Sequence, residues 1–81
     1  MFTNKSHTGE HNLCGKVVAQ RRKEMGKSQR QLADLLQLAG LDIDKNAIQR
    51  IEAGKRFVTD IELVYLSTVL QVSLDQLLSV K

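Results

Sequence analysis

The chain has 81 residues, enough for one domain, and a domain of this size buries only about 60% of the surface that its unfolded chain exposes. It contains no Trp, no Pro and five Gly, so a turn-rich sheet is disfavoured and a compact all-α bundle is favoured. No apolar run approaches the roughly 20 residues of a membrane span, and no signal-peptide core follows the N-terminus. We therefore expect a cytoplasmic protein with no membrane partner.

The net charge of +3 is unevenly distributed along the chain. Residues 16–56 hold ten Lys or Arg and five Asp or Glu, a net charge of +5, whereas residues 57–81 carry a net charge of −2. A surface that binds a polyanion needs such a basic region. Many proteins with pI above 9 bind no polyanion, so charge alone does not establish the function.

Residues 1–11 show no hydrophobic periodicity, and we expect them to form a flexible N-terminal tail ahead of a single helical domain over residues 12–81. The spacing of His7, His11 and Cys14 imitates a metal site, but these residues straddle the tail and the start of a helix. We therefore predict no metal and no cofactor, and we expect Cys14 to be a free, buried thiol.

A first helix is predicted from about Asn12 to Gly26, because apolar positions recur there at helical spacing. The stripe, which is interrupted by an arginine, consists of Cys14, Val18, Arg22 and Met25. A glycine at position 26 suits the left-handed conformation that ends many helices.

Four further helices are indicated by their capping patterns. Residues 28–31, 59–62 and 73–76 read Ser/Thr-x-x-Gln/Glu, which is the capping box, and Asp44 is a good N-cap residue. Hydrophobic staples accompany the last three starts: Ile43 with Ile48, Val58 with Leu63, and Val72 with Leu77. Gly40 and Gly54 follow the last turns of the second and third helices. Five helices are therefore predicted.

The inner faces of these helices supply the expected core. The residues assigned to it are Leu32, Leu35, Leu36 and Ala39 in the second helix, Leu66 and Leu70 in the fourth, and Leu74, Leu77 and Leu78 in the fifth. Phe57 is expected to join the core at the junction of helices three and four.

The third helix has one apolar and one polar face. At about 100° per residue, Ile48 and Ile51 fall on one side. The opposite side carries Lys45, Asn46, Gln49, Arg50 and Ala53. The apolar side is suited to packing, and the polar side is suited to entering a DNA major groove.

An ordered set of residues carries a resemblance to a known family. The matching positions are Arg22, Gly26, S-Q-x-x-L-A at 28–33, I-x-x-I-E-x-G-K at 48–55, and L-x-x-L-x-x-x-L-x-V-S-L-x-x-L-L at 63–78. Together they resemble the lambda repressor and Cro type of helix-turn-helix domain, the Xre-like family of small bacterial and phage transcription regulators. The likeness extends from Cys14 to Leu78 and includes all five predicted helices.

The resemblance implies a five-helix bundle whose second and third helices bind double-stranded DNA, with the third in the major groove. It implies a sequence-specific transcription regulator, most simply a repressor. Because one such domain makes a small interface with DNA and no separate dimerisation domain is evident, we expect a weak homodimer through helix five or the preceding loop. Carried over by position, Gln29 contacts phosphate and reaches a base. The base-facing positions are Lys45, Asn46, Ala47 and Arg50, with Gln49 on the same face, and the phosphate positions beyond the helix are Lys55 and Arg56.

The residue types suit these roles. Asn and Gln bond adenine edges, Arg and Lys bond guanine, and an alanine such as Ala47 packs on a thymine methyl group, each good bidentate pair giving roughly 1–3 kcal/mol of discrimination. Ser28, Gln29 and Arg30 stand at a helix N-terminus, where free amides and the helix dipole favour a phosphate. Such contacts set the register of the protein on DNA more than its specificity.

Two structural expectations accompany the resemblance. Arg22 and Glu52 match family positions that pair, and we predict a partly buried ion pair between the first and third helices. The stretch between Leu36 and Lys45 is about five residues longer than is usual in the family, so either the second helix gains about a turn or the connection bulges.

The sequence supports the alternatives to DNA binding less well. No nucleophile lies beside a base and no glycine loop precedes a lysine, so we predict no enzymatic activity. A protein-interaction module of the same fold, such as an antitoxin or antirepressor with a protein partner, is the main alternative, although a partner-binding helix would expose more apolar anchors. RNA binding is disfavoured because the A-form major groove is too narrow for a helix.

Overall fold

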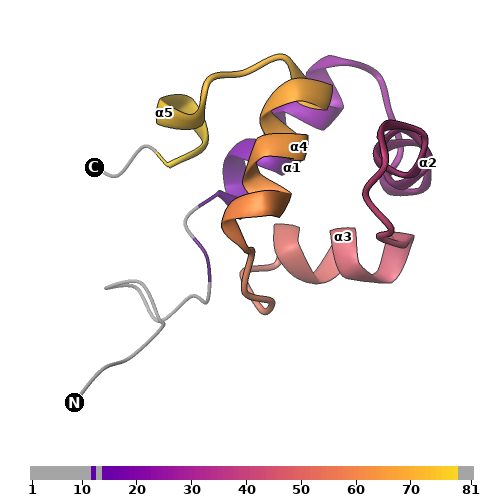
Figure 1. Ribbon diagram of the computed structural model, residues 1–81, viewed down its shortest axis with the longest axis horizontal. Helices are drawn as coiled ribbons and strands as arrows, with labels where there is room; N and C mark the ends of the chain where they lie inside the picture. The colour runs from indigo at the N-terminus through magenta and orange to yellow at the C-terminus, as the bar shows by residue number, and fades with distance from the viewer. Residues whose placement is uncertain (1–11, 13, 79–81) are drawn as a thin grey trace.

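The structure is a computed structural model that describes Asn12 and residues 14–78. This part of the chain contains five helices and no strand: α1 (Gly15–Glu24), α2 (Gln29–Ala39), α3 (Lys45–Glu52), α4 (Asp60–Leu70) and α5 (Leu74–Leu77). In the view of Figure 1, α3 lies below the other helices, α2 lies to one side and α5 to the other. The predicted all-α, five-helix fold is confirmed, whereas the predicted tail with His7 and His11 lies outside the described residues.

The capping patterns set the helix starts as predicted. At the start of α2, the Ser28 hydroxyl accepts from the Gln31 backbone N–H at 3.0 Å, and the Gln31 side chain accepts from the Ser28 N–H at 2.8 Å. The same reciprocal pairs form at α4 and α5. At α3, the Asp44 carboxylate accepts from the Ala47 N–H at 2.8 Å. Each cap satisfies backbone donors that have no partner inside their helix.

The first helix begins later than predicted, at Gly15 rather than near Asn12. The Asn12 side chain instead accepts from the Gly15 N–H at 2.8 Å and donates to the backbone carbonyls of Ile51 at 3.0 Å and Arg56 at 2.8 Å. A Cβ atom at position 15 would overlap the Ile51 carbonyl oxygen. Glycine is therefore needed for the close approach of α1 to the end of α3.

The core lies between α1, α2, α3 and α4, and it is closed at one end by α5. Its buried apolar residues are Cys14, Val18, Leu32, Ala33, Leu36, Ile43, Ile48, Ile51, Leu66, Leu70 and Leu77. Burial raises the pKa of the Cys14 thiol to about 11, so this free thiol is protonated at neutral pH.

The connection between α2 and α3 consists of residues 40–44. Helix α2 continues to Ala39 and ends at Gly40, whose φ of 115° is readily adopted only by glycine. The Gln37 side chain donates to the Ile43 carbonyl at 2.7 Å, and the Ile43 side chain is buried. The connection is thus held against the body of the domain by the Gln37 bond and the buried Ile43 side chain.

Four predicted core residues are exposed. Phe57 is 50% exposed because it lies in the irregular segment before α4, where Val58 and the Arg56 side chain take the inward positions. Ala39 is exposed at the end of α2. Helix α5 has a single turn that directs Leu77 inward, and it leaves Leu74 and Leu78 about two-fifths exposed, at 42% and 41%.

Two negative findings concern the described residues. No helix among them has the length and apolarity needed to cross a bilayer. Within the same residues, no group of three or more His, Cys, Asp or Glu side chains is arranged to hold a metal ion.

Candidate nucleic-acid interface

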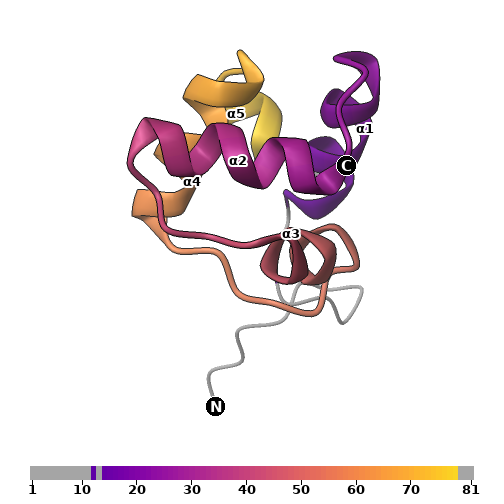
Figure 2. The same cartoon turned by 90° about the vertical axis from the view of Figure 1, so that its right-hand side faces the viewer.

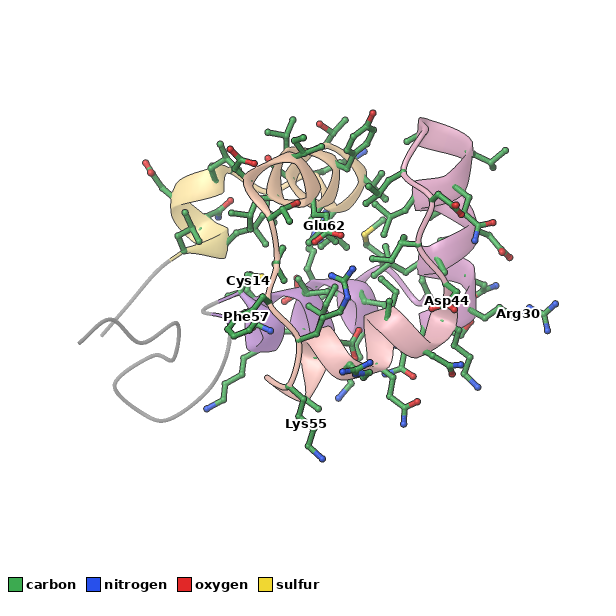
Figure 3. All side chains as sticks on the ribbon, turned by 60° about the horizontal axis from the view of Figure 1, so that its bottom comes forward. Cys14, Arg30, Asp44, Lys55, Phe57 and Glu62 are labelled. Carbon is green, nitrogen blue, oxygen red and sulfur yellow. The ribbon has the colours of Figure 1, made fainter. Side chains whose placement is uncertain are left out.

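Helix α3 has the two faces that its sequence predicts. Ile48 and Ile51 are fully buried, Ala47 is half-buried, and the opposite side is exposed. The exposed residues are Lys45, Asn46, Gln49, Arg50 and Ala53. Figure 3 shows Lys55, just beyond α3, and Arg30 on α2 extending away from the body of the domain. Helix α3 thus presents amide and cationic groups outward on a rigid, packed element.

The donors on this face are not used within the domain. The side chains of Lys45, Asn46, Gln49, Arg50 and Lys55 make no hydrogen bond or ion pair with any residue that the structure describes. They border two shallow hollows of about 320 Å³ each, one along α3 and one between α2 and the start of α3. Asn46 lines both hollows. These donors are therefore available to an external acceptor.

The start of α2 is partly committed to internal contacts. The Ser28 hydroxyl accepts from the Gln31 N–H, and the Gln29 Nε2 donates to the Glu52 carboxylate at 3.1 Å. A primary amide carries two hydrogens on nitrogen, so Gln29 keeps one donor for another acceptor. Arg30 is exposed and has no side-chain partner among the described residues.

The two cations after α3 are placed differently. Lys55 is exposed, whereas the Arg56 guanidinium donates through both terminal nitrogens to the two Glu62 oxygens, at 3.0 Å each. In Figure 3, Glu62 points from α4 into the domain. Both residues were predicted as phosphate positions, and of the two only Lys55 has a charge with no ion-pair partner among the described residues.

The Arg56–Glu62 pair predicts a loss of stability in acid. Hydrogen bonding from Arg56 holds the pKa of Glu62 below its usual 4.5. A carboxyl with a lower pKa in the folded state stabilises the fold above its unfolded pKa, and this contribution is lost as the pH falls through the folded value. We expect urea denaturation from neutral pH to about pH 3 to show wild type losing more stability than Glu62→Gln. If the free energy of unfolding fell equally with pH in wild type and in Glu62→Gln, the Arg56–Glu62 pair would not be the cause.

The predicted partners Arg22 and Glu52 form a two-point ion pair. The Arg22 Nε and Nη2 donate to the two Glu52 oxygens at 2.7 and 3.0 Å, and the side chains are only 11% and 8% exposed. This hydrogen bonding raises the pKa of Arg22, so the guanidinium stays charged. Because Glu52 also accepts from Gln29, a single carboxylate joins α1, the start of α2 and the end of α3.

Two residues that hold the end of α3 and the segment after it were not identified from the sequence as tertiary contacts. Asn12 appeared only as an approximate helix start, and no periodic pattern marks an isolated amide that bonds distant carbonyls. Glu62 was recognised as a capping residue, and one of its oxygens does accept from the Thr59 N–H at 3.0 Å. Its second role, as the partner of Arg56, depends on tertiary proximity.

Comparison with known proteins identifies the family. A family model described as Helix-turn-helix matches residues 18–77. The crystal structure of the restriction-modification controller protein C.AhdI from Aeromonas hydrophila aligns with a TM-score of 0.67 and 27% sequence identity, covering 78% of this chain and 84% of that one. A search of curated proteins gave no match. The family match spans most of the chain, including both helices of the α2–α3 unit. The chain therefore belongs to the lambda repressor and Cro type, Xre-like helix-turn-helix family of DNA-binding transcription regulators.

Proposed function

We propose that this chain is a sequence-specific, double-stranded DNA-binding repressor that places α3 in the major groove. The observation that carries the proposal is the division of α3 into a buried isoleucine face and an exposed face of donors with no partner in the described chain. Base edges in the major groove offer acceptors that such donors match. No catalytic step or cofactor is part of this function.

The exposed groups fall into two roles. On α3, Asn46 and Gln49 suit adenine, and Lys45 and Arg50 suit guanine, while the half-buried Ala47 suits a thymine methyl group. The remaining proposed contacts, beside α3, are to phosphate. Ser28 and Gln29 contribute through the N-terminus of α2, and Arg30 and Lys55 through cations that have no ion-pair partner in the described chain. Arg56 contributes through the guanidinium N–H groups that do not bind Glu62. Base contacts then set specificity and phosphate contacts set register.

The distribution of exposed apolar side chains favours DNA over a protein partner for α3. The large apolar residues that are substantially exposed are Leu38, Phe57, Ile61, Val64, Leu74 and Leu78. None of these described residues belongs to α3. A groove-binding helix that recognises a protein presents apolar anchors, whereas this one presents amides and cations.

We propose that two copies bind together. A single module makes a small interface with DNA, and dimers gain affinity and specificity by reading two half-sites about one helical turn apart. Leu74 of α5 and Leu78 just after it, with Ile61 and Val64 of α4, supply exposed apolar surface for a homodimer contact. The description of C.AhdI as a restriction-modification controller supports a regulatory role for the fold.

Selection from a random duplex pool tests this function. We expect an enriched motif with two half-sites about 10 base pairs apart, bound with an affinity that falls as salt is raised. Light scattering on the complex should give two chains per duplex. Binding without sequence enrichment, or no binding at all, would overturn the proposal.

A further inference from the structure

The outer face of α1 carries a second basic surface outside the α2–α3 unit. Lys16, Gln20 and Lys23 recur at spacings of four and three residues, so they lie on one face of the helix, and all three are exposed. We call these three residues the α1 ridge. It borders an open hollow of about 580 Å³ that is also lined by Ala19, Glu24 and Glu52.

The charge of this hollow is positive because its carboxylates are already paired. Glu24 lies 3.5 Å from the Arg21 guanidinium, and Glu52 is bound by Arg22 at 2.7 Å. Lys16 and Lys23 make no ion pair or hydrogen bond through their side chains with any described residue. The ridge thus offers two uncompensated ammonium groups with an amide donor between them, which complements a polyanion.

The ridge is continuous with the proposed DNA interface. Glu52, which lines the hollow, is the last residue of α3 and accepts from Gln29 at the start of α2. Figure 2 shows the start of α2 beside α1, with α3 below them. A DNA strand that passes the N-terminus of α2 is therefore close to the hollow on α1.

We propose that the α1 ridge binds the sugar-phosphate backbone flanking the bases read by α3, an inference that rests on the proposed function. Lys16 and Lys23 are seven residues apart, a separation of about 10 Å along a helix. A strand carries one phosphate per nucleotide, so two ammonium groups this far apart can contact different phosphates of the same strand. Gln20 lies between the two lysines on α1 and can donate to the backbone between those phosphates.

The test is the salt dependence of binding to the selected duplex, measured by fluorescence anisotropy. Each neutralised phosphate contributes about 0.9 to the slope of log affinity against log salt, so Lys16→Gln/Lys23→Gln should reduce the magnitude of the slope by about 1.8. The loss of affinity should be uniform across cognate and unrelated sequences. Lys16→Arg/Lys23→Arg keeps both charges and should bind as wild type does. Because both positions are exposed, the domain should remain folded, which circular dichroism will check.

A matched control separates local contact from net charge. Leu38→Glu/Thr68→Glu changes the net charge by the same amount at exposed positions on α2 and α4, outside the α1 ridge, and should leave the slope unchanged. Shortening the duplex to the selected half-sites should remove the difference between wild type and the double glutamine variant, because the flanking phosphates are then missing.

The outcomes distinguish the two proposals. An unchanged slope in Lys16→Gln/Lys23→Gln, or an equal loss in the control, overturns the role of the ridge while sequence-selective binding by α3 stands. In the first case the ridge would be free to bind an acidic protein instead. A wild-type chain that binds no duplex overturns the proposed function and the ridge with it.

Discussion

Replacing Glu52 by alanine is expected to lower the free energy of unfolding by about 3–5 kcal/mol. The substitution leaves the Arg22 guanidinium, whose side chain is 11% exposed, without its carboxylate partner, and it removes the acceptor of Gln29. Removing one partner of a buried ion pair costs more stability than the intact pair contributes, because the remaining charge has neither water nor a carboxylate around it. Urea denaturation monitored by circular dichroism measures the loss.

The control for this prediction is the Arg21–Glu24 pair on α1, the helix that also carries Arg22. The Glu24 side chain is 53% exposed, and exposed pairs typically contribute 0.2–1 kcal/mol, so Glu24→Ala should cost much less stability than Glu52→Ala. The double variant Arg22→Ala/Glu52→Ala should be less destabilised than the sum of its single variants, because neither charge is then stranded. An unchanged melting temperature for Glu52→Ala would show that the pair has no structural role.

The sequence predicted those parts of the fold that depend on local chemistry. Capping boxes at Ser28, Thr59 and Ser73 fixed three helix starts, since each bond joins residues three apart. The buried positions of Ile48 and Ile51 followed from helical periodicity. The same periodicity places the amides and cations of α3 on the opposite, exposed face, so most of the candidate interface was also predictable.

The features that were missed depend on distant contacts or on weakly patterned segments. The bonds from Asn12 to Ile51 and Arg56 span about forty residues, and the sequence between them carries no sign of the pairing. Phe57 was expected in the core at the junction of helices three and four, yet it is half-exposed in the irregular segment before α4. Arg56 was assigned as a phosphate position from the family resemblance, which gives no indication that its guanidinium pairs with Glu62.

Two substitutions at exposed cations are expected to separate base reading from phosphate binding. Arg50 lies on the outward face of α3, and Lys55 lies beyond its end. Arg50→Ala should weaken binding to the selected duplex by about 1–3 kcal/mol, because a bidentate contact to guanine is lost. Its preference at one base position should relax, so that duplexes altered there bind the variant about equally well. Lys55→Ala should weaken all duplexes to a similar degree and reduce the salt slope by about 1.

Arg50→Ala and Lys55→Ala each remove one charge, and neither side chain has a partner in the described chain. Neither change strands an internal group, so both proteins should unfold at the wild-type urea concentration, and a difference in binding is then a difference at the interface. Affinities measured against the selected duplex and its single-base variants give the discrimination at each position. If Arg50→Ala lowered every affinity equally and kept the wild-type base preference, Arg50 would be a phosphate contact. The bases would then be read by Lys45, Asn46 and Gln49 without it.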